Sequence, residues 1–221
     1  MNNPRDWHVL LIGGASGVGK TSIAYPLARH FGIGITQIDD FQVILERMTA
    51  PERYPDVHLF RTRPEAFFAM DEDAKLAHAI AYATAMAEAL EYVVANHLAG
   101  EPPIVLEGDF LLPALAARPS FDGIAAAGRV RALFVVEPDE DQIANNYAAR
   151  EGDHQPVRAR ASWRYSEWLR AEASRRHLPV LEARPWDTAF ERALALLSGP
   201  EAADDGEGPG DDHQLPPPAR G

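Results

Sequence analysis

The chain has 221 residues, of which 46% are apolar, a net charge of −12 and no cysteine. This length suffices for one α/β domain with a sizeable core. The absence of cysteine excludes disulfides, thiolate metal sites and cysteine catalysis, and it fits a cytoplasmic location. The acidic balance argues against nucleic acid as the main partner, and no apolar run approaches the roughly 20 residues that span a membrane.

Short apolar runs alternate with helical patterns along the chain. Strands are expected, in chain order, over Trp7–Ile12, Ile33–Ile38, Ile104–Leu106, Val130–Val136 and Leu178–Leu181. Helices are expected over Lys20–Phe31, from Phe41, between Leu76 and Leu98, from about Asp139 to Arg150, over Trp163–His177 and over Asp187–Leu197. This alternation predicts a parallel sheet with helices on both faces. Pro26 conflicts with the first helix, which it should kink or destabilise.

The composition divides the chain into a folded part, residues 1–197, and a tail, residues 198–221. The tail is rich in proline, glycine and acidic residues and has almost no apolar side chains. Because it cannot bury enough surface to offset its ordering entropy, we expect it to be disordered.

A glycine-rich motif joins the first expected strand to the first expected helix. It reads Gly14-Ala15-Ser16-Gly17-Val18-Gly19-Lys20-Thr21 and matches the complete P-loop pattern. Glycines let the backbone wrap around phosphates, and the N-terminus of the following helix favours their negative charge. Lys20 would then reach the β- and γ-phosphates, and the Thr21 hydroxyl would bind Mg²⁺. The motif therefore predicts that the chain binds ATP with Mg²⁺.

Carboxylates follow two of the other expected strands. Asp39 and Asp40 come after the second, and Glu107 and Asp109 after the third. Asp39 could take a proton from an attacking hydroxyl or hold the metal's water shell, although either it or Asp40 could instead cap the next helix. Glu107 is placed to orient Mg²⁺, whereas Asp109 could contact substrate or serve turn chemistry.

Arginines gather in two stretches. Arg61 and Arg63 follow a proline-containing loop, where they could contact an acceptor. Four more flank the segment Glu151–Pro156, which we expect to be flexible; they are Arg150, Arg158, Arg160 and Arg164. A mobile lid over about residues 150–164 could stabilise charge on a transferring phosphoryl group and exclude water. The alternative is that these arginines simply face solvent on helix surfaces.

The tripeptide Pro185-Trp186-Asp187 follows the fifth expected strand. It lies where an adenine ring could rest. The interpretation we favour from sequence is an ordinary helix start with Asp187 as the cap.

Taken in order and spacing, the P-loop, Asp39-Asp40-Phe41, Leu106-Glu107-Gly108 and the Arg150 region resemble P-loop kinases related to uridine kinase and nicotinamide riboside kinase. The runs Leu11–Lys20 and Ile104–Pro113 are also similar to the kinase domain of 2-phosphoglycerate kinase. The resemblance implies a five-stranded parallel sheet in the order 2-3-1-4-5. It also implies that Asp39 is a base or metal partner, that Glu107 is the acidic residue on strand three, and that Arg150 belongs to the lid.

These features predict an enzyme that transfers the γ-phosphoryl group of ATP to a hydroxyl of a small metabolite. Lys20, Asp39, Glu107 and Arg150 are the expected catalytic residues, and the metal is expected at Thr21, Asp39 and Glu107. Substrate contacts are expected from Asp40, Arg61, Arg63, Asp109 and Arg158. The alternatives are a nucleotide hydrolase or switch and an ATP-binding regulatory module without an acceptor. The oligomeric state stays open.

Overall fold

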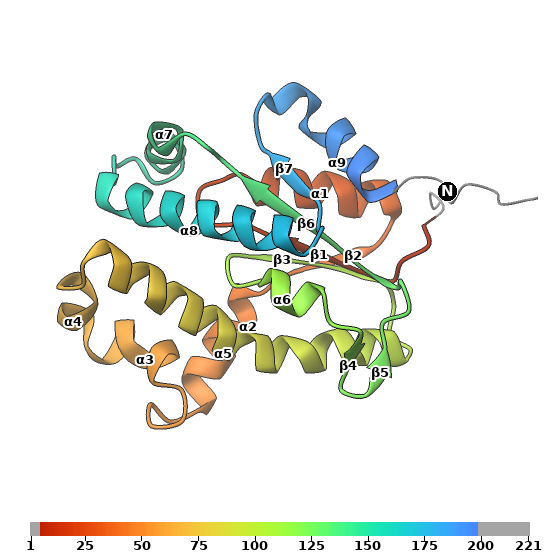
Figure 1. Cartoon of the computed structure of the whole chain (residues 1–221), viewed down its shortest axis with the longest axis horizontal. Helices are drawn as coiled ribbons and strands as arrows, with labels where there is room; N and C mark the ends of the chain where they lie inside the picture. Colours follow the sequence, from red (N-terminus) through yellow and green to blue (C-terminus); the bar gives the residue numbers. More distant parts are fainter. Residues whose placement is uncertain (1–4, 199–221) are drawn as a thin grey trace, which may run out of the picture.

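The computed structural model describes residues 5–198, which form a sheet of five parallel strands between two layers of helices (Figure 1). The strands of this sheet are β1 (Val9–Gly13), β2 (Gly34–Gln37), β3 (Ile104–Gly108), β6 (Val130–Val136) and β7 (Val180–Glu182). Their spatial order is β2-β3-β1-β6-β7, which confirms the predicted order once the strands of the sheet are counted in sequence. The predicted disordered tail lies, apart from Ser198, outside the described residues.

The helices and the remaining strands have the following bounds. The first half of the chain contains α1 (Lys20–Phe31), α2 (Asp39–Met48), α3 (Pro55–Thr62), α4 (Pro64–Phe68) and α5 (Glu72–Ala99). The second half contains α6 (Pro113–Ala116), β4 (Ser120–Phe121), β5 (Ile124–Ala125), α7 (Glu140–Glu151), α8 (Pro156–Arg175), the 3₁₀ turn η1 (Trp186–Thr188) and α9 (Ala189–Ser198). Within residues 5–198, no helix combines the length and hydropathy needed to cross a membrane.

The central strand β1 is apolar along its whole length because helices cover both of its faces. All five of its residues are buried, as expected for a strand inside a parallel α/β sheet. Helices α1 and α9 pack on one face, while α5, α6 and α8 lie on the other (Figure 1). The alternation of strands and helices in the sequence therefore predicted the architecture correctly.

The strand register brings several polar residues to one edge of the sheet. Gly13 of β1 pairs with Gly108 of β3, so these two strands end at the same level, whereas β6, whose Phe134 also pairs with Gly13, continues to Val136. Glu107 lies beside Gln37 of β2 in the neighbouring pair. Ligands of such sheets bind beyond the carboxyl ends of the strands. The register therefore places these polar residues where a ligand would bind.

Helix α1 continues through Pro26, which lies inside it. A proline at this point cannot donate a hydrogen bond to the carbonyl one turn earlier. The helix nevertheless reaches Phe31 and ends at Gly32, whose left-handed backbone lets its N–H bond to the carbonyls of Ala28 and Arg29. Burial of its apolar face outweighs the local cost of the proline, because Ile23 and Leu27 on either side of it pack into the core.

Two parts of the fold were absent from the prediction. Helices α3 and α4 occupy the segment between α2 and α5 and pack along α5 with α2 (Figure 1). A short antiparallel hairpin, β4–β5, precedes β6 and turns at Asp122 and Gly123, both with positive φ. Asp-Gly is a strong signal for a two-residue hairpin, so the sequence did contain the information for this turn.

A close contact at the end of β3 predicts a stability effect. A Cβ added at Gly108 would lie 2.1 Å from Cγ1 of the buried Ile38. We expect Gly108→Ala to lower the free energy of unfolding, measured by urea denaturation, by about 1–3 kcal/mol, the usual cost of overpacking a core.

Gly34→Ala in the neighbouring strand is the matched control, because a Cβ there meets nothing within 4 Å. If both variants lowered the free energy of unfolding equally, a clash with Ile38 would not be the cause.

Candidate active site

The P-loop lies between β1 and α1, as its sequence requires. Gly14 has a φ of 154°, and a Cβ there would lie 2.3 Å from the carbonyl oxygen of Val135. Gly19 has a φ of 96°, and its Cβ would lie 2.1 Å from the indole ring of Trp186. These glycines are needed both for the left-handed turns and for the close approach of neighbouring atoms.

Side chains of α7 and α8 hold the P-loop from outside. The Asn146 amide donates to the carbonyl of Gly17 at 2.8 Å, and the Ser162 hydroxyl donates to the carbonyl of Ser16 at 2.6 Å. Tyr147 in turn donates to the Ser162 hydroxyl at 3.2 Å. Because the two edges of a trans peptide point in opposite directions, these contacts leave the N–H groups of the same peptide planes facing the other way. The loop is thus held in one conformation by residues far away in sequence.

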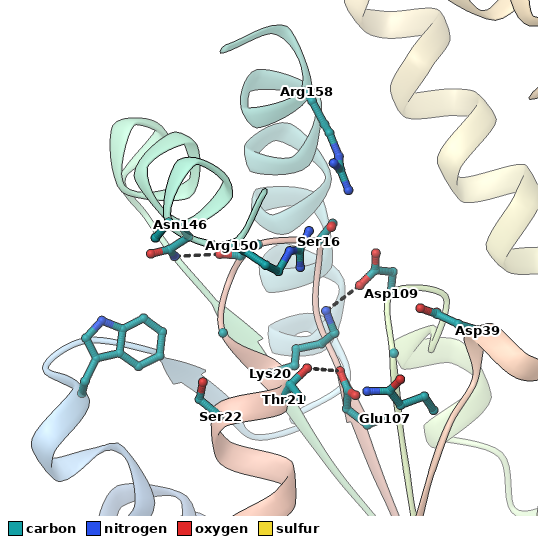
Figure 2. A pocket seen from close by; sticks show the side chains of 16 residues that line it. Ser16, Lys20, Thr21, Ser22, Asp39, Glu107, Asp109, Asn146, Arg150 and Arg158 are labelled. Carbon is teal, nitrogen blue, oxygen red and sulfur yellow. Dashed lines mark hydrogen bonds and ion pairs between the residues drawn. The ribbon is translucent and has the colours of Figure 1, made fainter. Parts of the chain in front are cut away.

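The Lys20 ammonium is buried beneath the loop. Its Nζ lies 2.5 Å from Oδ1 of Asp109 and donates to the carbonyl of Ala15 at 2.9 Å (Figure 2). Only 6% of the Lys20 side chain is exposed, against 31% for Asp109. A buried ammonium needs a partner of opposite charge, and Asp109 supplies it. Asp109 therefore does more than turn the chain after β3.

Glu107 and Thr21 lie together at the base of the site. The Thr21 hydroxyl donates to Oε1 of Glu107 at 3.3 Å. Glu107 is almost fully buried, and this burial raises the pKa of its carboxyl, with the Lys20 charge acting in the opposite direction. Among the described residues, no group of three or more His, Asp or Glu side chains is arranged to hold a metal ion by itself.

Asp39 begins α2, and its carboxylate faces the same space as Asp109 (Figure 2). Its side chain reaches solvent, yet the protein atoms around it partly desolvate the carboxyl and raise its pKa. The Asp109 carboxylate raises the Asp39 pKa further, while the Lys20 ammonium lowers it. Neither Asp39 nor Asp40 caps α2, because the capping position is Ile38, which has no side-chain bond.

These groups line one open cavity of about 850 Å³ (Figure 2). Its lining consists of Ser16, Gly17, Gly19, Lys20, Thr21, Ser22, Gln37, Asp39, Glu107, Gly108, Asp109, Asn146, Ala149, Arg150, Arg158 and Trp186. Most of the predicted site residues therefore meet in one place, although they come from distant parts of the chain.

The four arginines of the predicted lid separate into two pairs. Arg150 and Arg158 line the cavity, bind Glu151 at 2.5 and 2.8 Å, and lie over the ring of Tyr147. Arg160 and Arg164 are bound elsewhere, to acidic residues at the starts of α5 and α7: Glu72, Asp73 and Glu140. The two helices α7 and α8 also extend into the segment expected to be flexible, leaving only residues 152–155 between them.

Three predicted substrate residues lie outside the cavity lining: Asp40, Arg61 and Arg63. Arg61 donates to the carbonyl of Glu46 at 3.3 Å and lies 3.1 Å from Nδ1 of His58. Arg63 is the residue between α3 and α4. Their positions give no support to a contact with substrate.

Sequence reasoning left several lining residues out of the site, and Trp186, which it considered beside an adenine ring but did not favour, is the most informative. The tripeptide does start a helical segment, but Trp186 begins η1 after Pro185 and Asp187 is not the cap. The indole is 39% exposed and lies against Gly19. The available signal was the place of a tryptophan directly after the last strand of a parallel sheet, where ligands bind. Asn146 offered no such signal within its helix.

Solved structures define the class of fold. A gluconokinase from Sinorhizobium meliloti 1021 is 20% identical, with 88% of this chain and 94% of that chain covered and a TM-score of 0.51. A sugar kinase from Janibacter sp. HTCC2649 is 21% identical, with coverages of 87% and 95% and a TM-score of 0.53. A shikimate kinase from Acinetobacter baumannii, in complex with shikimate, is 14% identical, with coverages of 88% and 95% and a TM-score of 0.50. The chain therefore has the fold of P-loop small-molecule kinases.

A family model identifies the chain more closely. The model of the isopentenyl transferase family matches residues 7–132, more than half of the sequence, and the chain belongs to this family. The match includes the P-loop, Asp39, Glu107 and Asp109. It ends before α7 and α8, which carry the arginines of the cavity lining. The resemblance to uridine kinase, nicotinamide riboside kinase and 2-phosphoglycerate kinase is supported only as far as the shared kinase fold. No curated protein matches the chain.

The position of Trp186 predicts a contribution to nucleotide affinity. Base–aromatic stacking contributes about 1–3 kcal/mol, so Trp186→Ala should raise the Kd for ATP, measured by calorimetry, by about fivefold to a hundredfold. Trp186→Phe should keep most of the affinity.

Inorganic triphosphate is the matched ligand, because it has no base to stack. If Trp186→Ala weakened both ligands equally, the indole would be supporting the P-loop and not contacting a base.

Proposed function

We propose that this protein is an ATP-dependent phosphotransferase that moves the γ-phosphoryl group to a hydroxyl of a small metabolite. The supporting observation is the convergence of Lys20, Asp39, Glu107 and Asp109 beside a complete P-loop in one cavity. Phosphoryl transfer depends mainly on positioning and on stabilisation of negative charge. The cavity has cationic groups for the phosphates on one side and carboxylates for an acceptor on the other.

Each charged group then has a role. Lys20 binds the β- and γ-phosphates, and their charge replaces Asp109 as its partner. Thr21 and Glu107 offer the hard oxygen ligands that Mg²⁺ prefers, and the phosphates and water would complete its shell. Asp39 accepts the proton of the attacking hydroxyl, which its raised pKa favours. Mg²⁺, when bound, would neutralise charge on the phosphates.

Arg150 and Arg158 fit the role of lid groups. Both reach the cavity from the α7–α8 connection, and both are held by one exposed partner, Glu151. An exposed ion pair contributes little and exchanges readily. The guanidinium groups can therefore turn from Glu151 to a phosphoryl group as its charge develops.

Family membership favours a second candidate, the transfer of an isopentenyl group from a diphosphate to an acceptor. The P-loop suits a diphosphate as well as a triphosphate. However, the side chains that line the cavity are mostly polar, and those of Ala149 and Trp186 are the apolar ones. A five-carbon hydrocarbon group needs apolar walls, so the lining favours phosphoryl transfer.

One experiment separates the candidates. Purified protein is incubated with Mg·ATP and a panel of nucleosides, sugars, phosphoglycerates and aminoglycosides, and ADP and phosphorylated product are measured. A parallel series contains dimethylallyl diphosphate in place of ATP, with AMP and other amines as acceptors, and prenylated product is measured. We expect acceptor-dependent ADP release that Asp39→Asn abolishes. Prenylated product without acceptor-dependent ADP release would instead establish the second candidate, and ADP release that needs no acceptor would indicate a hydrolase.

The charges around Asp39 predict a pH dependence. Since the base must be deprotonated, kcat/KM should fall as the pH drops through the Asp39 pKa, at a value above the ordinary 3.8 of aspartate. Asp109→Asn removes a carboxylate that raises this pKa, so the acidic limb should move to lower pH. Arg150→Gln removes a charge that lowers the pKa and should move the limb to higher pH. Movement of both variants in one direction would show that another group titrates.

A further inference from the structure

We infer that the acceptor is a neutral or positively charged hydroxyl compound, such as a polyol or amino alcohol, and not a carboxylate or phosphate. This inference rests on the proposed phosphoryl transfer and concerns the same cavity. It follows from how the charged side chains around the cavity are distributed and already paired.

The two halves of the cavity differ in charge. Asn146 and Arg150 lie on one side of the Lys20 ammonium, whereas Asp39 and Asp109 lie on the other (Figure 2). Asp40 lies outside the lining, but its charge also acts on Asp39. An acceptor hydroxyl must stand within reach of Asp39 to lose its proton. It therefore binds in the half of the cavity where carboxylates gather.

The basic groups that line the cavity are required elsewhere. Lys20 is the phosphate ligand of the P-loop, and Arg150 and Arg158 approach from the α7–α8 side, where both contact Glu151. No other lysine or arginine of residues 5–198 lines the cavity. When phosphates bind Lys20 in place of Asp109, the ammonium no longer neutralises the Asp109 carboxylate. The acceptor half of the cavity then becomes more negative.

Two arginines outside the cavity lining are bound to other groups. Arg61 is bound to the Glu46 carbonyl and His58, while Arg164 is bound to Glu72 and Asp73. A carboxylate substrate near Asp39 and Asp109 would thus meet like charges, and such juxtaposition is strongly unfavourable. A hydroxyl or ammonium group would instead donate hydrogen bonds to Asp39 and Asp109.

Sets of compounds that share a carbon skeleton and differ in charge test the inference. Glucose, gluconate and glucosamine form one set, and glycerol, glycerate and 2-amino-1,3-propanediol form another. ADP release with Mg·ATP is measured at neutral pH, and we expect kcat/KM for the neutral or amine member to exceed that for the carboxylate by about tenfold or more.

Asp109→Asn adds a direct readout of the electrostatic cause. This variant should reduce the ratio of kcat/KM for the neutral or amine compound to kcat/KM for the carboxylate by about fivefold. Asp122→Asn, the same change in the exposed β4–β5 turn, should leave this ratio unaltered. A carboxylate preferred in either set would overturn the inference while leaving the phosphotransferase intact. If no compound caused ADP release although calorimetry showed that Mg·ATP binds, the proposed function would be overturned, and the inference with it.

Discussion

The contact between Lys20 and Asp109 is the interaction on which the site depends. The ammonium is nearly inaccessible to solvent and is held by one carboxylate and one backbone carbonyl. A charge in this position would be strongly unfavourable if it were unpaired. Asp109 supplies the opposite charge while no phosphate is present, and the phosphates of a nucleotide can take over the same role. The residue that allows Lys20 to be buried thus also defines the position that a ligand must occupy.

Around this pair, the protein gathers more negative charge than it neutralises. Burial raises the pKa of Asp39 and of Glu107, the Asp109 carboxylate raises both further, and the Lys20 ammonium acts in the opposite direction. Such crowding disfavours the folded state, and proteins retain it chiefly where chemistry needs shifted pKa values. The hydrophobic β1, with its neighbours β3 and β6, provides the rigid base that holds these groups close together.

Helices α7 and α8 connect this charged centre to the fold. Asn146 and Ser162 fix the P-loop carbonyls, while Arg150 and Arg158 on the same two helices reach over the cavity. One helical pair therefore both holds the P-loop and supplies two arginines to the cavity lining.

The sequence alone determined the layers, the strand order and the phosphate-binding loop. These follow from local signals: continuous apolar strands, glycines that permit left-handed turns, and a lysine and threonine at fixed spacing. It also predicted that Asp39 and Glu107 lie at one edge of the sheet, where both line the cavity, because residues at the ends of parallel strands meet there.

Only the tertiary structure decided which side chains face that edge together. The pairing of Lys20 with Asp109, the packing of Trp186 on Gly19 and the hold of Asn146 on the P-loop all join residues far apart in sequence. It also directed Arg160 to acidic residues at the starts of α5 and α7 and Arg164 to the start of α5, although both share a helix with Arg158. Spacing along a helix gives the face on which a residue lies, but the neighbour that this face meets depends on how the whole chain packs.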